Sequence, residues 1–189
     1  ATLASELASD PAPWLRRVAK VEETSLGDQR RAAASLEELL QTDPHDDAAL
    51  AELARLRGAL GEHASRAEVL GRRADLARGE ARRELLIERA TILERELERP
   101  AAAHRALQAA AGTLGPKDKA ERRRLAGERM RLLAEVNEPA ALLDATEDAL
   151  AHAGGEQDER ELLAKVGQLS GGAIYRPARA VEVYRDLYR

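Results

Sequence analysis

The side chains that most often carry catalysis are few and scattered in this sequence. The four histidines are His45, His63, His104 and His152. A catalytic nucleophile needs a base within hydrogen-bond reach. Only His63-Ala64-Ser65 sets a serine beside a histidine, and this stretch reads as a loop entering a helix. There is no cysteine, which excludes disulfides and thiolate metal sites. We therefore expect no catalytic residue, no metal site and no cofactor, and we interpret the chain as not an enzyme.

Two histidines have neighbours that suggest structural roles. His45-Asp46-Asp47 contains candidate metal ligands, but Asp46 or Asp47 stands where a helix begins. Because a carboxylate there accepts hydrogen bonds from free backbone N–H groups, N-capping is the preferred interpretation. His104 aligns with Val181 in the internal repeat described below, which favours packing over catalysis.

The charge and aromatic content of the chain indicate whether protein or nucleic acid is the favoured partner. The chain holds 30 basic and 34 acidic residues, with a net charge of −4. Its strongest basic run, Arg122-Arg123-Arg124, is followed by an acid-rich stretch, so we interpret it as a helix surface facing an acidic neighbour. Aromatic residues make up 2% of the chain, too few to stack many bases of a single strand. Binding to protein or peptide is the preferred function, and a nucleic-acid-binding helical repeat is the alternative.

The elements that position these side chains are expected to be helices. Alanine, leucine, arginine and glutamate dominate, and these residues lose little on entering a helix. Apolar residues recur at helical spacing between short Gly and Pro breakers. The pattern predicts helices at 13–26, 28–42, 46–60, 62–78, 80–98, 100–112, 117–135, 139–153, 157–173 and 177–189, with residues 2–9 as the end of an earlier one. Short loops between them predict antiparallel hairpins.

The chain also repeats itself at a fixed distance. Residues 84–110 align without a gap on residues 161–187, an offset of 77, with Arg99-Pro100 matching Arg176-Pro177. Such a period indicates stacked supersecondary units. We predict an all-α superhelix, or solenoid, of about five antiparallel helix hairpins at 13–42, 46–78, 80–112, 117–153 and 157–189. These would form one domain over residues 1–189, a segment of a larger protein.

Small residues recur 13 apart within the predicted hairpins. The pairs are Ala19/Ala32, Ala54/Ala67, Ala90/Ala103, Gly127/Ala140 and Gly167/Ala180. Two helices can approach closely where the contact residues are small, so each pair predicts a hairpin interface. The Gly127 unit departs from the others, because Arg123 stands where they carry leucine. Its register is shifted or its hairpin is irregular. Gly171 and Gly172 predict that the helix at 157–173 ends or bends near 171.

These residues resemble the tetratricopeptide repeat family. Gly27-Asp28, Ala32 and Asp43-Pro44 match the second half of its motif, while Leu50, Leu53 and Ala54 match the core of its first helix. The resemblance implies a right-handed superhelix whose first helices line a concave groove that binds peptides or proteins. The function implied is a non-catalytic scaffold for protein–protein interaction.

The resemblance also implies which side chains line the groove. The positions include Arg16, Lys20, Arg55, Thr91, Arg95, Arg124, Glu128, Arg131 and Gln168. Arg16, Lys20 and Arg55 suggest a shallow basic pocket for a carboxylate or acidic peptide, since arginine forks bind carboxylates well. The competing interpretation is that these are ordinary solvated charges.

The last predicted helix is more apolar than a capping helix should be. Tyr184, Leu187 and Tyr188 lie on it. Either the array continues beyond Arg189, or this face meets a second copy and the chain self-associates. No apolar run approaches the ~20 residues that a membrane span requires. We expect no membrane span and a cytoplasmic location.

Overall fold

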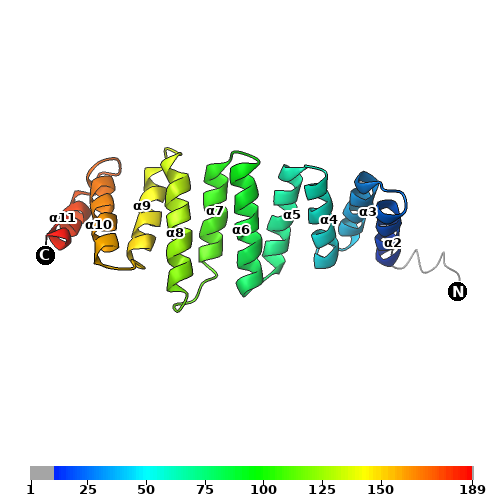
Figure 1. The fold of residues 1–189 in the computed structure, drawn as a ribbon, viewed down its shortest axis with the longest axis horizontal. Coiled ribbons are helices and arrows are strands. Elements are labelled where there is room, and N and C mark those ends of the chain that lie inside the picture. Colours follow the sequence, from blue (N-terminus) through cyan, green and yellow to red (C-terminus); the bar gives the residue numbers. More distant parts are fainter. Residues whose placement is uncertain (1–10, 189) are drawn as a thin grey trace. The chain divides into compact units, whose positions relative to one another are not determined.

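The computed structural model of the chain describes residues 11–188 and is all-helical over that range (Figure 1). The first half contains α2 (Ala12–Thr24), α3 (Gln29–Thr42), α4 (Asp47–Ala59), α5 (His63–Leu76) and α6 (Gly79–Arg95). The second half contains α7 (Pro100–Ala111), α8 (Lys119–Ala134), α9 (Pro139–Leu150), α10 (Glu156–Gly171) and α11 (Pro177–Leu187). Each predicted helix within residues 11–188 is confirmed. The prediction for residues 2–9 lies outside the described residues.

The helix ends follow from local chemistry. Asp46 caps α4 as predicted, because its carboxylate accepts a hydrogen bond from the backbone N–H of Ala49 at 3.0 Å. Asp28 caps α3 in the same way through the N–H of Arg31. Proline occupies the first position of α7, α9 and α11, where its missing N–H costs nothing. Helix α10 ends at Gly171, which confirms the predicted end near that residue.

Two compact units make up the fold, one up to Ile92 and one from Leu93 onward, and the division falls inside α6. In the first unit α2 packs on α3, α3 on α4, and α4 on α5. In the second unit each helix from α7 to α11 packs on the next. Both units therefore consist of antiparallel hairpins in which a helix packs on its neighbours in the chain. The single domain spanning 1–189 stays a prediction.

The core of each unit forms a narrow seam of leucine, valine and alanine. Leu36, Leu50, Leu53 and Leu70 are fully buried in the first unit. In the second, Leu143, Val166 and Val183 form one cluster that joins α9, α10 and α11. The aromatic residues lie far apart in the chain: Trp14 is on α2, with the guanidinium of Arg17 5.5 Å from its ring centre, whereas all three tyrosines follow α10.

The predicted small residues are buried in four of the five hairpins, and the fourth pair is wrong. Gly127 and Ala140 are both exposed, whereas Leu125 and Ala126 are buried in α8. The register of α8 is therefore shifted. Gly167 does mark a close approach, because a Cβ there would lie 2.9 Å from Cζ of Tyr184.

The 77-residue repeat is visible in the backbone. Glu98 and Tyr175, which are 77 apart, have positive φ angles of 52° and 49°. The N–H of the next residue closes the same turn in both places. Arg99 donates to the carbonyl of Leu93 at 2.7 Å, and Arg176 donates to that of Ser170 at 2.6 Å. The repeated sequence thus produces a repeated hairpin turn.

Candidate functional site: a basic hollow on α8

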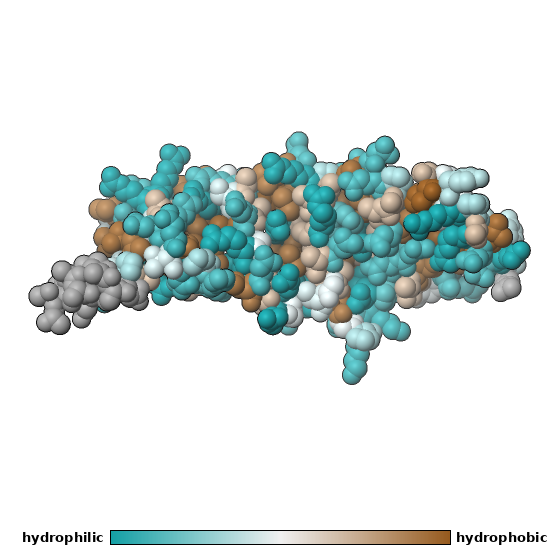
Figure 2. Space-filling view, turned by 180° about the vertical axis from the view of Figure 1, so that it is seen from behind, coloured by the Kyte–Doolittle hydropathy of each residue, from teal (hydrophilic) through white to brown (hydrophobic). Residues whose placement is uncertain are grey.

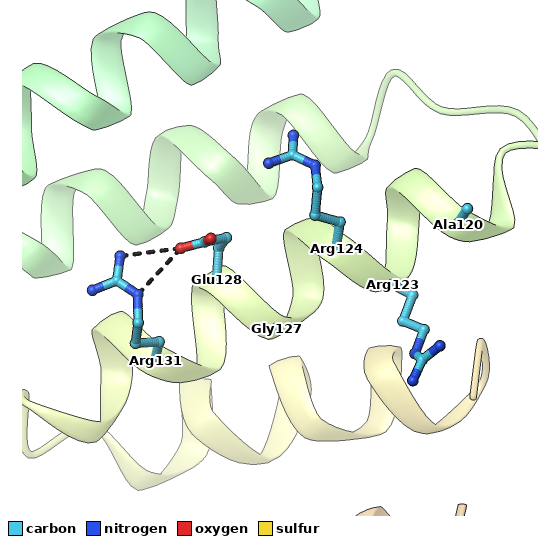
Figure 3. Close-up of a pocket in the computed structure, with 6 residues that line it drawn as sticks. All are labelled: Ala120, Arg123, Arg124, Gly127, Glu128 and Arg131. Carbon is cyan, nitrogen blue, oxygen red and sulfur yellow. Dashed lines mark hydrogen bonds and ion pairs between the residues drawn. The ribbon is translucent and has the colours of Figure 1, made fainter. Parts of the chain in front are cut away.

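An open hollow of about 440 Å³ lies along one face of α8 in the second unit. Its lining residues are Ala120, Arg123, Arg124, Gly127, Glu128 and Arg131 (Figure 3). They recur at steps of three and four, which places them on one side of a helix. Three guanidinium groups and one carboxylate therefore border the same shallow surface.

No long side chain covers the middle of the hollow, because the residues there are small. A Cβ added at Gly127 would have no heavy atom within 4 Å, so the space above this residue is open. Ala120, which lies near the start of α8 on the same face, is also exposed. The longer side chains stand around this small-residue strip, which leaves backbone and methyl surface accessible between charged groups.

Two of the three arginines are held by carboxylates along α8 and from α6. Arg124 donates two hydrogen bonds to Glu121, at 2.9 Å and 2.7 Å. Arg131 contacts Glu94 of α6 at 2.7 Å. It also contacts Glu128 at 3.1 Å (Figure 3). The hydrogen bond that Arg124 donates to Glu121 raises the pKa of Arg124, and the one that Arg131 donates to Glu94 raises the pKa of Arg131. Both guanidiniums stay charged and keep a fixed direction, while about half of each side chain remains exposed.

Arg123 and Arg124 border the hollow on different edges, and their side chains point away from each other (Figure 3). The Arg123 guanidinium contacts Asp158 of α10 at 2.8 Å, and it lies against Gly154, where an added Cβ would meet Arg123 Nη1 at 2.0 Å. The predicted partner of the arginine run was the acidic stretch that follows it, and for Arg123 that prediction is confirmed. Gly154 leaves the room that this side chain needs.

The burial pattern shows how far the register of α8 is shifted. Leu125, Ala126 and Arg129 are buried with the spacing of Ala49, Leu50 and Leu53 in α4. Met130 is then the counterpart of Ala54, three residues after the predicted position at Gly127.

An ion pair supports the shifted register. Arg55, the residue after Ala54, contacts Glu23 of α2 at 2.6 Å. Arg131, the residue after Met130, makes the matching contact with Glu94 of α6. The same cross-helix pair therefore recurs two hairpins apart, between first helices of neighbouring hairpins.

In the predicted basic pocket of the first unit, two of the three cations already form ion pairs with carboxylates. Arg16 forms an ion pair with Asp46, and Arg55 forms one with Glu23. Lys20 is exposed on α2. Because two of the three cations already contact carboxylates, a ligand would compete with these pairs. The role of the three residues in binding stays a prediction.

The other predicted groove residues fall into two groups. Arg124, Glu128 and Arg131 lie together around the hollow on α8. Thr91 and Arg95 are exposed on α6, where the Thr91 hydroxyl donates to the carbonyl of Ile87. Gln168 is exposed on α10 and does not line the hollow.

Ala120, Arg123 and Gly127 are lining residues that the sequence did not predict. The predicted register of α8 took Gly127 as a buried residue that contacts the next helix, whereas Gly127 is exposed. The signal that could have corrected it is the pair Leu125-Ala126 followed by Leu132-Leu133, all of which are buried. Such apolar spacing marks the buried side of a helix and places Gly127 outside it.

The hollow offers charge and shape rather than reactive groups. Guanidinium groups bind carboxylates through paired hydrogen bonds. The six lining residues include no histidine, serine or threonine. Over residues 11–188 no group of three or more His, Asp or Glu side chains clusters tightly enough to hold a metal ion. In the same range no helix has the length and apolar character needed to cross a membrane.

Comparison with known proteins gives structural similarities alone. No family model matches the chain, and no curated protein does. A crystal structure of MamA protein has a TM-score of 0.46 at 16% identity, covering 95% of this chain and 91% of that one. YrrB, described as "a TPR protein with an unusual peptide-binding site", has a TM-score of 0.44 at 15% identity, covering 99% of this chain and 91% of that one.

A third similar structure contains the TPR-like repeats of a putative kinesin light chain from Podosopora anserina. It has a TM-score of 0.40 at 16% identity, covering 97% of this chain and 95% of that one. Similarity at this level carries no argument about function. By its own antiparallel hairpins and recurring buried small residues, the described part of this chain has an all-α helical-repeat fold.

Proposed function

We propose that the protein is a non-catalytic scaffold that binds an acidic peptide segment of a partner protein in the hollow on α8. The observation that carries the proposal is the set of half-exposed guanidiniums, Arg123, Arg124 and Arg131, around a floor of small residues. Ion pairs already orient the three side chains, and a ligand carboxylate would share each guanidinium with Asp158, Glu121 or Glu94 through the half of the side chain that remains exposed.

The chemistry of the hollow favours a peptide over nucleic acid. Glu121, Glu128 and Asp158 stand beside the arginines and would repel a continuous line of phosphates. A peptide with spaced carboxylates can reach single guanidiniums and set its own apolar side chains on Ala120 and Gly127. This arrangement supports the peptide alternative.

Binding can be measured with fluorescent peptides that differ in charge alone. We would titrate the full chain into a decapeptide library that alternates Asp or Glu with Ala or Leu, and into matched Lys peptides, by fluorescence anisotropy. We expect acidic peptides to bind and Lys peptides not to. Because charge-assisted hydrogen bonds contribute about 1.5–3 kcal/mol, Arg124→Glu and Arg131→Glu should each weaken binding about tenfold or more.

A second variant blocks the site without changing its charge. Gly127→Leu places a side chain in open space, so the fold should persist while the floor of the hollow is filled. The matched control is Arg160→Glu, because Arg160 lies on α10 outside the hollow and pairs with Glu156. Equal affinity in Gly127→Leu, Arg124→Glu and the unchanged protein would refute this site.

The same assay reports on the basic pocket predicted for the first unit. Arg55→Glu removes one cation that already contacts Glu23. We expect a smaller loss of affinity than for Arg124→Glu. A larger loss of affinity would indicate that the peptide binds at α2 and α4 instead.

A further inference from the structure

Helix α8 contains a short internal repeat of seven residues. Residues 121–127, with the sequence ERRRLAG, align on residues 128–134, with the sequence ERMRLLA. The identical positions are Glu121/Glu128, Arg122/Arg129, Arg124/Arg131 and Leu125/Leu132. Because seven residues make almost two full turns of an α-helix, each repeated side chain returns to nearly the same face. The repeat therefore places the same group twice along one side of α8.

The repeated group beside the hollow is an arginine held by the glutamate three residues before it. Nε and Nη2 of Arg124 donate to Glu121 at 2.9 Å and 2.7 Å. Nε and Nη2 of Arg131 donate to Glu128 at 3.2 Å and 3.1 Å (Figure 3). Nη1 takes no part in either set of bonds, and about half of each arginine side chain is exposed. Since both arginines reach back to the residue three before them, their guanidiniums are about as far apart as their Cα atoms, about 10 Å.

This separation requires one ligand group for each arginine. A charge-assisted hydrogen bond is about 2.7–2.9 Å long, so a single carboxylate or phosphate group reaches only one of two guanidiniums that lie about 10 Å apart. Gly127 lies between the two arginines, and a Cβ there would have no heavy atom within 4 Å. A ligand that uses both arginines therefore carries two carboxylates and crosses the open space over Gly127.

The backbone conformation of a peptide decides how many residues separate two such carboxylates. In a polyproline II segment, residues three apart share a face and lie about 9 Å apart. In a β-strand, residues on one face lie about 7 Å or about 13 Å apart, and neither distance fits. A helix two turns long fits the distance, but at about 10 Å wide it occupies about 800 Å³, nearly twice the 440 Å³ of the hollow. The polyproline II segment is therefore the best match.

We propose that the hollow selects a peptide segment with two acidic side chains three residues apart, bound as polyproline II with one carboxylate on Arg124 and the other on Arg131. This inference rests on the proposed function and adds the spacing that the partner must have. Glu128 is half-exposed between the two arginines and would repel an acidic residue placed between the two carboxylates.

Charge spacing suits the kind of surface that this chain presents. The face of the molecule seen in Figure 2 is mostly hydrophilic, with apolar residues in small patches. On such a surface the positions of charges distinguish one partner from another more sharply than apolar contact does.

The test measures how affinity depends on the separation of two glutamates. Fluorescent peptides of one composition would carry two glutamates in a background of proline and alanine, separated by one to five positions. A peptide with glutamates seven positions apart in an alanine-rich background represents the helical alternative. By fluorescence anisotropy with the full chain, we expect binding at three positions to be about tenfold tighter than at one or five, because those spacings leave one arginine without a carboxylate.

The outcomes separate the spacing from the proposed function. Equal affinity at every separation would overturn the spacing and leave the acidic-peptide proposal standing. Tightest binding by the peptide with glutamates seven apart would also overturn it, because the partner segment would then be helical. If no acidic peptide binds, both proposals fail.

Paired substitutions test which carboxylate meets which arginine. Arg124→Gln and Arg131→Gln each remove one charge from the protein, and glutamine replaces each glutamate of the best peptide in turn. Each variant should bind the intact peptide about tenfold more weakly, yet should match the unchanged protein on the peptide that lacks its own glutamate. Coupling of both arginines to the same glutamate would contradict the proposal.

The matched control is Arg123→Gln. Arg123 lines the same hollow, but its counterpart in the seven-residue repeat is Met130, so it belongs to neither arginine pair. Loss of its charge should weaken all acidic peptides alike and should couple to neither glutamate. Coupling to one glutamate as strong as that of Arg124 would replace the assigned pair of arginines.

Discussion

Helices α4 and α8 occupy equivalent places in their hairpins but fill the core differently. In α4 the buried position is Leu53, which sits among other leucines. In α8 the equivalent position is Arg129, which contacts Asp144 at 2.6 Å and Asp148 at 2.9 Å on α9. A helix hairpin can therefore be closed by an apolar contact or by a buried cation with two carboxylates.

The apolar contact of α4 and the charged contact of α8 tolerate different substitutions. The leucine contact depends on filled volume, and its loss leaves a cavity. The arginine contact depends on pairing, because a buried charge without a partner is costly and a well-packed apolar replacement is often neutral or better. The α4 core should lose stability when side-chain volume is removed, whereas the α8 core should lose stability when one charged group is removed without an apolar replacement.

The largest expected effect is in the α4 core. Leu53→Ala should lower the free energy of unfolding by about 3–4 kcal/mol through lost burial and a cavity. Arg129→Ala should lower it by about 2–3 kcal/mol, below the value for a fully buried pair, because Asp144 is largely exposed and can regain water. Urea denaturation followed by circular dichroism measures both.

The control for this pair is Arg129→Leu, which gives α8 the residue that α4 carries. We expect its free energy of unfolding to be close to that of the unchanged chain, or higher. A loss equal to that of Arg129→Ala would mean that the ion pairs themselves stabilise α8, and the equivalence with Leu53 would fail.

Two glycines sharpen the contrast between the shifted and unshifted registers. Gly127→Ala should stabilise the chain by about 1 kcal/mol, because the helix gains alanine where no atom lies within 4 Å. Gly167→Ala should lose that gain or destabilise, since the new methyl displaces the ring of Tyr184. Thermal unfolding of both variants shows the difference. Removing the ring with Tyr184→Ala should restore the gain at Gly167; an unchanged cost would point to another cause.

The smallest expected effect is a pH dependence at His104. Burial lowers the pKa of this imidazole, and the positive charge of Arg129 lowers it further. The unfolded chain therefore takes up the proton first, near the ordinary value of about 6.5. Stability should be complete above this pH and should fall as the pH drops from there toward the folded pKa.

The matched variant is His104→Val, which places at 104 the residue found 77 positions later. Urea unfolding at about pH 7.5 and about pH 5.5 should show a smaller loss of stability in this variant than in the unchanged chain. An equal loss in both proteins would assign the pH dependence to other groups.

The helices were predictable because local signals agreed. Alanine and leucine at helical spacing, Asp46 at a cap and proline at first positions all favour the same boundaries, and the structure places the described helices within a few residues of them. The hairpin turn at Arg99-Pro100 and Arg176-Pro177 was predictable from the repeat alone.

The candidate site was predictable only in part. Arg124, Glu128 and Arg131 line the hollow although they were counted from Gly127, because a shift of three residues on a helix returns to nearly the same face. Their role in binding stays a prediction. The predicted register of α8 was wrong because Gly127 is small and Arg129 is charged. Residue size and charge indicated that Gly127 is buried and Arg129 exposed, and the structure shows the reverse. The burial of Arg129 depends on Asp144 and Asp148 on α9, a pairing between helices that no local pattern contains.

The segregation of the aromatic residues gives the molecule two built-in optical probes. Trp14, the chain's single tryptophan, belongs to the first unit, and Tyr175, Tyr184 and Tyr188 belong to the second. Light at the red edge of indole absorption excites Trp14 alone, whereas phenol emission comes from the region of α11. The melting of each half can therefore be followed separately in one cuvette, with no dye attached to the protein.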